Sequence, residues 1–332
     1  MNMLSPADTP APVLPTATRW WILVGIGLAC LAPWLVYPMF LIKLMCFALL
    51  AASVNFLIGY AGLLSFGHAM FFGAAAYVTG HAVKVWGWDG AAGILAGVAV
   101  AASFGLLTGF LAIRRQGIYF SMITLAFAQL VYFLALRMPF TGGEDGLQSV
   151  PRPMLLGFYD TSSTMSFYYA CLLAIGLGFW LIYRAVHSPF GQVLRAIRDN
   201  EPRAKSLGYP VNRYKLLAFV LSATLAGLAG AMKVLAFQLA TLTDVSWTTS
   251  GEALLICIVG GLNTMLGPIV GSIVIGSMEH YLAGFAEWVL IIQGAVFVVV
   301  VMLFRKGIVG QLQAWWRERQ QRRTVAPLRK AT

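Results

Sequence analysis

Apolar residues occur along this chain in long stretches without charge. A helix that spans a membrane needs about 20 consecutive, mostly apolar residues. Stretches of that order recur along the whole chain: 20–42, 44–83, 90–113, 116–136, 161–183, 216–232, 253–278 and 288–304. The pattern predicts an all-α protein that crosses a membrane many times.

Two of these stretches are predicted to divide. As a single helix, 44–83 would be about 60 Å long, too long for one crossing, and Gly59-Tyr60-Ala61-Gly62 offers a break. Gly260 to Asn263 and Gly267-Pro268 interrupt 253–278. Its first half is too short to cross unaided, so it either starts outside the membrane or is a half-helix packed within protein. We expect about ten crossings, with about eight as the lower limit.

Composition supports a membrane protein. The chain is 59% hydrophobic and 11% charged, with a mean hydropathy of +0.79, whereas soluble domains are about 25% charged. A soluble core of this length cannot bury so much apolar surface, and the abundance of apolar residues excludes disorder. We expect an uncleaved, disordered cytoplasmic tail at 1–18, a permease-like membrane domain at 19–304 and a basic cytoplasmic tail at 305–332.

The basic residues indicate the orientation. The net charge of +11 would suggest nucleic acid in a soluble protein, but here it gathers in alternate loops. With ten crossings and the N-terminus inside, the opposite side keeps only five basic residues and receives most of the acidic ones. These five are Lys43, Lys84, Arg137, Arg152 and Lys233. The positive-inside rule therefore predicts that both termini are cytoplasmic.

Few groups at membrane depth could carry chemistry. An ionisable side chain at the bilayer centre costs about 2.5–3.5 kcal/mol and marks a pump or proton relay by default. The predicted spans hold neutral polar residues instead, which are candidates for a translocation path: Asn55, Ser65, His68, Thr124 and Gln129. His68 has a second interpretation, as a helix-start residue bonded to neighbouring backbone. This pattern disfavours a proton- or sodium-driven carrier without excluding it.

No catalytic or metal-binding motif is visible. The four cysteines and four histidines are scattered, with no C-x-x-C pair and no set of metal ligands. The phosphate-binding loop G-x-x-x-x-G-K-[ST] and the G-x-S-x-G elbow do not occur. We therefore expect a non-catalytic chain that binds no cofactor, and any ATP hydrolysis must occur on another chain.

The segment 188–210 predicts two short helices at the cytoplasmic surface. Ser188 followed by Pro189 is typical of a helix N-cap and first turn. Phe190, Val193, Leu194 and Ile197 then share one face. On another face, Arg195 and Asp199 are spaced to form an i, i+4 ion pair.

The second helix of this segment is predicted from its capping residues. Pro202 is expected to end the first helix, Asn200 to cap the second, and Gly208 to close it. Such a pair could rest on anionic lipid headgroups or dock to a cytosolic partner. The mixed charges and capped ends favour the partner.

Several motifs in a fixed order carry a family resemblance. From about residue 40 to 305 the chain resembles the inner-membrane permease subunits of bacterial branched-chain amino acid ABC transporters (the LivM-type family), with urea and amide permeases as close relatives. The shared pieces are Gly59 to Ala69 with Gly73 and Tyr77; Gly117 to Phe120 with Thr124 to Ala126; Thr141 to Gly143 with Asp145 to Leu147; Ser188 to Gly208; Lys215 to Phe219 with Ala226 to Gly230; and Gly260-Gly261 with Gly267-Pro268 and Gly271.

The resemblance implies a set of partners. These are a second permease (a homologue or a second copy), two cytosolic ATPases that use ATP and magnesium, and a periplasmic solute-binding protein. The segment 188–208 looks like the family's coupling loop, which enters a cleft on the ATPase. The coupling residues would be Phe190, Arg195, Arg198, Asp199, Glu201, Ala204 and Gly208. The binding protein would dock on the outer loop that holds Gly142, Gly143, Glu144 and Asp145, although turn chemistry explains that loop equally well.

Two other functions stay open at this point. The solute of such an importer could be urea, a short amide or another small acid instead of a branched-chain amino acid. A secondary transporter or channel that works without an ATPase is the alternative from another class. In each case we expect a multi-pass protein of the bacterial inner membrane.

Overall fold

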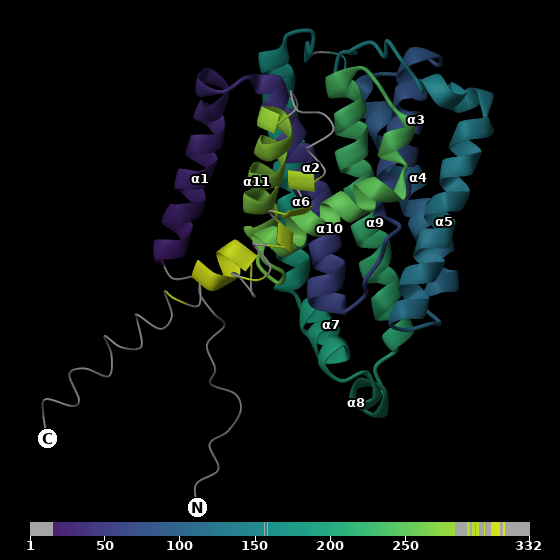
Figure 1. The fold of residues 1–332 in the computed structure, drawn as a ribbon, viewed down its shortest axis with the longest axis vertical. Helices are drawn as coiled ribbons and strands as arrows, with labels where there is room; N and C mark the ends of the chain where they lie inside the picture. The colour runs from purple at the N-terminus through teal and green to yellow at the C-terminus, as the bar shows by residue number, and fades with distance from the viewer. Residues whose placement is uncertain are drawn as a thin grey trace, which may run out of the picture.

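The computed structural model describes residues 16–155, 157 and 159–282, and beyond them 291–292, 294–295, 297–298, 302, 307–312 and 315. Every named element in the described residues is a helix, and extended pairing is limited to two isolated bridges. The elements shown in Figure 1 are α1 (Thr16–Leu35), α2 (Pro38–Phe56), η1 (Leu57–Ala61), α3 (His68–Lys84), α4 (Gly90–Ala112), α5 (Ile118–Arg137), η2 (Pro139–Thr141), η3 (Gly143–Asp145), α6 (Thr164–Val186), α7 (Pro189–Asp199), α8 (Glu201–Ser206), α9 (Val211–Phe237), η4 (Leu242–Asp244), α10 (Trp247–Gly260) and α11 (Gly267–Leu282). The expectation of an all-helical fold is confirmed for this part of the chain.

Five helices in the described part are long and apolar enough to cross a membrane. They are Pro38–Ala61, Gly90–Ala112, Ile118–Arg137, Thr164–Val186 and Val211–Phe237. Each corresponds to a predicted stretch. The predicted crossing at 288–304 and the two predicted tails lie wholly or largely outside the described residues.

The first boundary differs from the prediction. The stretch 20–42 is not one helix, because α1 ends at Leu35 and α2 begins at Pro38. A proline fits the first turn of a helix, where no amide donor is needed, but it forces the preceding residue out of helical conformation. Tyr37 accordingly has φ −54° and ψ 121°. Lys43 therefore lies within α2, where it forms an ion pair of 3.1 Å with Glu279 of α11.

Both predicted helix breaks are confirmed. The α2–η1 helix ends at Ala61, with Gly62 in the left-handed conformation (φ +69°), and α3 begins at His68. The second break separates α10 from α11. With 14 residues, α10 is too short to cross a membrane. It runs obliquely through the middle of the bundle in Figure 1, packed on α2, α3 and α11, as expected of a half-helix within protein.

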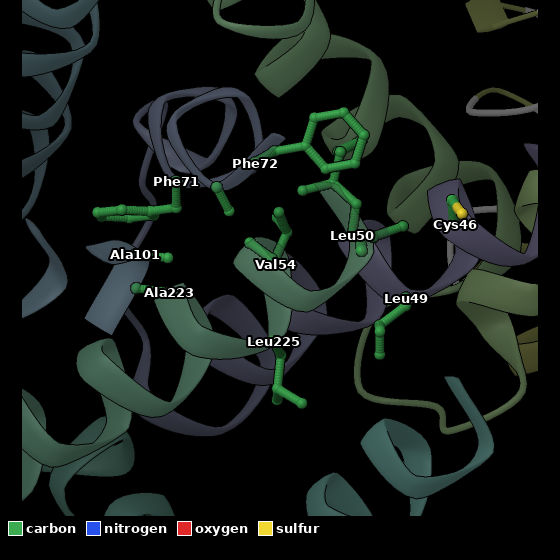
Figure 2. Close-up of a cluster of buried hydrophobic side chains, with 14 of the residues drawn as sticks. Cys46, Leu49, Leu50, Val54, Phe71, Phe72, Ala101, Ala223 and Leu225 are labelled. Carbon is green, nitrogen blue, oxygen red and sulfur yellow. The ribbon is translucent and has the colours of Figure 1, made fainter. Parts of the chain in front are cut away.

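The centre of the bundle is formed by α2 and α9. Of their apolar stretches, 72% and 67% are buried, compared with 28–33% for α4, α5 and α6, which therefore lie at the periphery. Figure 2 shows part of the core formed by α2, α3, α4 and α9. The labelled residues come from α2, α3, α4 and α9: Cys46, Leu49, Leu50, Val54, Phe71, Phe72, Ala101, Ala223 and Leu225.

Small residues allow α9 to lie close to its neighbours. A Cβ atom on Gly230 would collide with the carbonyl oxygen of Phe72 in α3, and one on Gly227 would collide with Ala101 in α4. Where lipid removes the hydrophobic drive between helices, such close backbone approach is a main source of packing energy. The two glycines thus mark the contact face of α9.

Substitution of Gly230 by Ala is expected to destabilise the protein by about 1–3 kcal/mol, because the methyl group overpacks the α3–α9 contact. The matched control is Gly176→Ala in α6, where a Cβ atom would meet nothing within 4 Å. Thermal unfolding of both variants in the same detergent tests this expectation. Equal unfolding temperatures for the two variants would contradict it.

Candidate functional site

The helix pair α7–α8 projects from one end of the bundle (Figure 1), and its caps agree with the sequence. The hydroxyl of Ser188 accepts a hydrogen bond from the Gly191 amide (3.4 Å), and the side chain of Asn200 accepts one from the Arg203 amide (3.0 Å). The role predicted for Pro202 is wrong. Asn200 is extended (φ −156°) and ends α7, whereas Pro202 lies in the first turn of α8.

The apolar face of α7 is covered by protein. Leu194 and Ile197 are buried, and Phe190 stacks on Tyr214 of α9 at 5.8 Å between ring centroids. Ala204 of α8 is also buried and packs with Ile197 and the first turn of α9. This face is therefore used to attach the pair to the bundle, and it is not free to rest on lipid headgroups.

The ion pair predicted between Arg195 and Asp199 does not form. Asp199 pairs with Arg198 instead, at 2.9 Å. Arg195 turns back toward the bundle, where its guanidinium lies 5.3 Å from the ring centroid of Tyr60 and donates to the carbonyl of Val186. Tyr60 belongs to the helix break and offers a cation–π contact, which replaces the pairing along the helix.

Arg198 connects α7 to both helix breaks. Its Nη1 donates to the carbonyl oxygen of Gly59 in η1 and to Oδ1 of Asn263, at 2.9 Å, in the turn between α10 and α11. Asn55 of α2 holds the same turn from the other side, since its Nδ2 donates to the Thr264 carbonyl (2.9 Å) and its Oδ1 accepts from the Asn263 amide (3.1 Å). Asn55, predicted to line a path, is engaged here in a structural contact.

Glu201 is the centre of a second link. Its carboxylate accepts from Lys215 of α9 (2.5 Å), from Lys205 of α8 (3.0 Å) and from Gln116 in the α4–α5 loop (2.7 Å). Burial alone would raise the pKa of this carboxyl, but the hydrogen bonds from Lys215 and Lys205 outweigh it and hold the pKa below its usual value of 4.5. Glu201 thus joins three segments instead of facing solvent.

The C-terminal end of α8 is exposed. The helix closes through hydrogen bonds from the Gly208 and Tyr209 amides to the carbonyls of Lys205 and Ala204, with Gly208 at φ +85°, as predicted for a glycine cap. Leu207 is 68% exposed and Tyr209 41% exposed. We call the exposed residues of this end the α8 tip: Arg203, Lys205, Ser206, Leu207, Gly208 and Tyr209.

Three of the other residues expected to line a path are paired within the protein. Nε2 of His68 lies 2.8 Å from the Ser222 hydroxyl, which donates to the Ser53 carbonyl. His68 begins α3, and the partner of its Nε2 is a side chain of α9. The Ser65 hydroxyl accepts from the Gly67 amide, and Thr124 accepts from the Phe66 amide. Gln129 lies on α5, half-buried.

The outer loop combines turn glycines with exposed acids. Gly142 and Gly143 have φ of +79° and +61°, and a Cβ on Gly142 would collide with the Gly146 carbonyl. Turn geometry therefore accounts for the glycines. Glu144 and Asp145 are exposed at this turn. Turn geometry alone does not require acidic side chains at these positions.

Sequence reasoning missed three residues of these links. Lys215, Gln116 and Asn263 each pair with a residue that is 14 to 85 positions away. Of the three, Asn263 had a sign in the local sequence, since it ends the Gly-Gly-Leu-Asn interruption of an apolar stretch. In the structure its φ is +64°, which is left-handed. No local spacing indicated its partner.

Glu201→Gln is expected to lower the stability of the purified protein by about 2 kcal/mol at neutral pH, because Lys215 loses its charged acceptor. Since the folded pKa of Glu201 is depressed, its contribution is present above the usual carboxyl pKa and is lost as pH falls through the lower folded value. The unfolding temperatures of the variant and the wild type should therefore converge in acid. Asp199→Asn, at an exposed pair, is the control and should have little effect. A difference from wild type that persists unchanged in acid would refute this role.

Comparisons with known proteins agree with this architecture. The chain is 27% identical over 292 residues to the high-affinity branched-chain amino acid transport system permease protein LivM of Escherichia coli (strain K12), covering 80% of this chain and 68% of the relative. It is 30% identical over 223 residues to the autoinducer 2 import system permease protein LsrC of Klebsiella pneumoniae, covering 62% and 60%. A solved structure, PsaBC from Streptococcus pneumoniae in complex with Fab, is 16% identical over 79% of this chain and 89% of that one, and its TM-score of 0.43 is too low to add to the assignment.

The family model described as "Branched-chain amino acid transport system / permease component" matches residues 36–301, which include every named element from α2 to α11. ABC permease components of this kind are non-catalytic, multi-pass membrane proteins that work with ATPase and binding-protein partners. The chain belongs to the branched-chain amino acid transport permease family.

Proposed function

We propose that this chain is a transmembrane subunit of an ATP-driven importer for branched-chain or related amino acids. It forms half of the translocation path and couples to separate ATPases through α7–α8. The observation that carries the proposal is the construction of this helix pair. Each helix is capped at its start, side chains of the pair attach it to η1, the α10–α11 turn, α9 and the α4–α5 loop, and the α8 tip is exposed. A rigid, protruding element of this kind suits the transfer of a mechanical displacement.

The proposed solute rests on the relatives. The LivM relative, named for branched-chain amino acids, matches 80% of this chain, whereas the LsrC relative, named for autoinducer 2, matches 62%. A relative named as a fructose import permease matches 36%. The greater coverage favours amino acids over autoinducer 2 or fructose.

We further propose ten crossings with both termini in the cytoplasm. The hydrogen bond between Gln116 and Glu201 supports this arrangement, because it brings the α4–α5 loop to the same end as α8. That loop also holds Arg114 and Arg115, and the α7–α8 segment is basic as well. In this topology 188–210 is the cytoplasmic coupling segment of the 19–304 permease domain, and 1–18 and 305–332 are cytoplasmic tails.

The proposed partners are a second permease subunit, two cytosolic ATPases and a periplasmic binding protein. The ATPase contact is the α8 tip, since Leu207 and Tyr209 are exposed apolar groups beside the cations of Arg203 and Lys205. Arg198, Glu201 and Ala204, which the family resemblance implies at this contact, each contact the bundle. They hold the coupling segment in place.

Leu207→Asp combined with Arg203→Glu is expected to reduce ATP-dependent uptake of leucine at least about tenfold, since losing apolar contact and inverting one charge removes more than about 1.4 kcal/mol of binding. Co-purification of the ATPase should fall in parallel, with the amount of permease in the membrane unchanged. Arg115→Glu, which makes the same charge inversion as Arg203→Glu on exposed surface at the same end of the bundle, is the control.

Uptake should be measured in vesicles that contain both permeases, the partner ATPases and the binding protein. Leucine, urea and fructose are compared as solutes. Leucine uptake by vesicles that contain this chain without any ATPase would contradict the proposal, as would full uptake by the double variant.

Glu144→Lys combined with Asp145→Lys tests the outer docking surface. The half-saturating concentration of binding protein should rise about tenfold, because like charge replaces opposite charge at an exposed rim. Uptake should recover when binding protein is in excess. Glu144→Gln with Asp145→Asn keeps the shape of the loop and should show a smaller shift. If both pairs of substitutions leave the half-saturating concentration unchanged, the loop serves turn geometry alone.

A further inference from the structure

The two helix breaks are joined to the coupling helix by one side chain. We propose that Arg198 is a positioning residue that fixes α7 to η1 and to the α10–α11 turn, so that both breaks move with α7. The cause of the α7 displacement, an ATPase partner, rests on the proposed function. The contacts of Arg198 lie within this chain and do not depend on a partner.

The first break contains a backbone acceptor, the Gly59 carbonyl oxygen, that bonds to Arg198. At the end of η1, the amide of Leu63 bonds to the Leu57 carbonyl and that of Gly62 to the Ile58 carbonyl. Carbonyls in the last turn of a helix lack the donors they would have in its interior. Arg198 Nη1 supplies a donor to the Gly59 carbonyl, and its positive charge is favourable at a helix C-terminus.

The second break is held from two sides. Arg198 donates to the side chain of Asn263, while Asn55 of α2 bonds to both the amide of Asn263 and the carbonyl of Thr264. The hydroxyl of Thr264 in turn donates to the Gly261 carbonyl. The turn that follows the half-helix α10 is therefore fixed to α2 on one side and to α7 on the other.

Two glycines make room for this link. A Cβ on Gly62 would lie 2.8 Å from Cγ of Arg198, and one on Gly59 would lie 3.0 Å from Oδ1 of Asn263. The absence of side chains at both positions makes room for Arg198 and Asn263. Gly62 also has the positive φ that favours glycine.

The link is sensitive to small displacements. Hydrogen bonds weaken steeply once the heavy atoms are more than about 3.5 Å apart. If α7 shifted by about 1–2 Å, as is typical of helix shifts in switching proteins, while the breaks stayed in place, Arg198 could not keep all of its bonds. Either both breaks follow α7, or they lose their donor. Since irregular backbone in a membrane needs partners from protein, following α7 is the favoured response.

The test begins with the permease alone in lipid nanodiscs. Amide hydrogen exchange is measured in 57–63 and 261–266 for Arg198→Gln, Asn263→Gly and Asn263→Asp. Gly tolerates the positive φ at 263 but removes the acceptor, whereas Asp keeps an oxygen for Arg198. Exchange in both segments should become about tenfold faster in Arg198→Gln, as expected for the loss of charge-assisted hydrogen bonds. Asn263→Gly should speed exchange in 261–266 and leave 57–63 near the wild type, because the bond from Arg198 to the Gly59 carbonyl remains, and Asn263→Asp should match the wild type in both segments.

The second measurement uses the assembled transporter. In Arg198→Gln and Asn263→Gly, the solute imported per ATP hydrolysed should fall about tenfold, with hydrolysis stimulated by the binding protein within about twofold of wild type. Asn263→Asp should keep the wild-type ratio. A parallel loss of hydrolysis and uptake would overturn the inference, because it would make Arg198 a contact for the ATPase. Unchanged exchange in 57–63 in the Arg198→Gln variant would also overturn it.

The two proposals fail in different ways. If wild-type vesicles show no ATP-dependent uptake, the proposed function is wrong, and the exchange experiment still decides whether Arg198 fixes the breaks. If Arg198→Gln does not fold, Asn263→Gly leaves Arg198 and its bonds to Gly59 and Asp199 in place and removes only the contact to the second break.

Discussion

Irregular backbone at membrane depth is stable only where protein supplies its hydrogen-bond partners, because no water is available there. This constraint governs the present structure. The chain interrupts two of its helical stretches, at 57–67 and at 261–266, and each interruption leaves polar backbone groups to be satisfied. Asn55 of α2, Arg198 of α7 and Thr264 of the α10–α11 turn supply partners for these groups.

The same constraint explains how the helix pair α7–α8 is held. Its apolar face packs on the start of α9, and several of its charged residues point back to the bundle instead of outward. Two attachments result, one through Arg198 to the helix breaks and one through Glu201 to α9 and the α4–α5 loop. A pair that is fixed at two places moves as a unit with the segments it contacts.

Most of the neutral polar residues predicted to line a path form hydrogen bonds within the bundle. His68, Ser222 and Ser53 form a chain of contacts between α3, α9 and α2, and the hydroxyls of Ser65 and Thr124 bond to the backbone between α2 and α3. In a membrane, such bonds add specificity to helix packing at modest energy. These residues hold helices together in this conformation, and Gln129 is left as the half-buried polar side chain of the set.

Sequence alone determined the features that depend on neighbouring residues. Long apolar stretches predicted α4, α5, α6 and α9, and the Ser188 and Asn200 caps predicted the starts of α7 and α8, since both signals act within one helical turn or one span. The helix start at Pro38 was not predicted, because the apolar stretch continues across it. Arg198, Glu201 and Asn55 also have partners in segments 14 to 209 residues away. Only the tertiary structure could decide them, because a side chain chooses among distant acceptors according to which helices pack together, and local spacing carries no record of that choice.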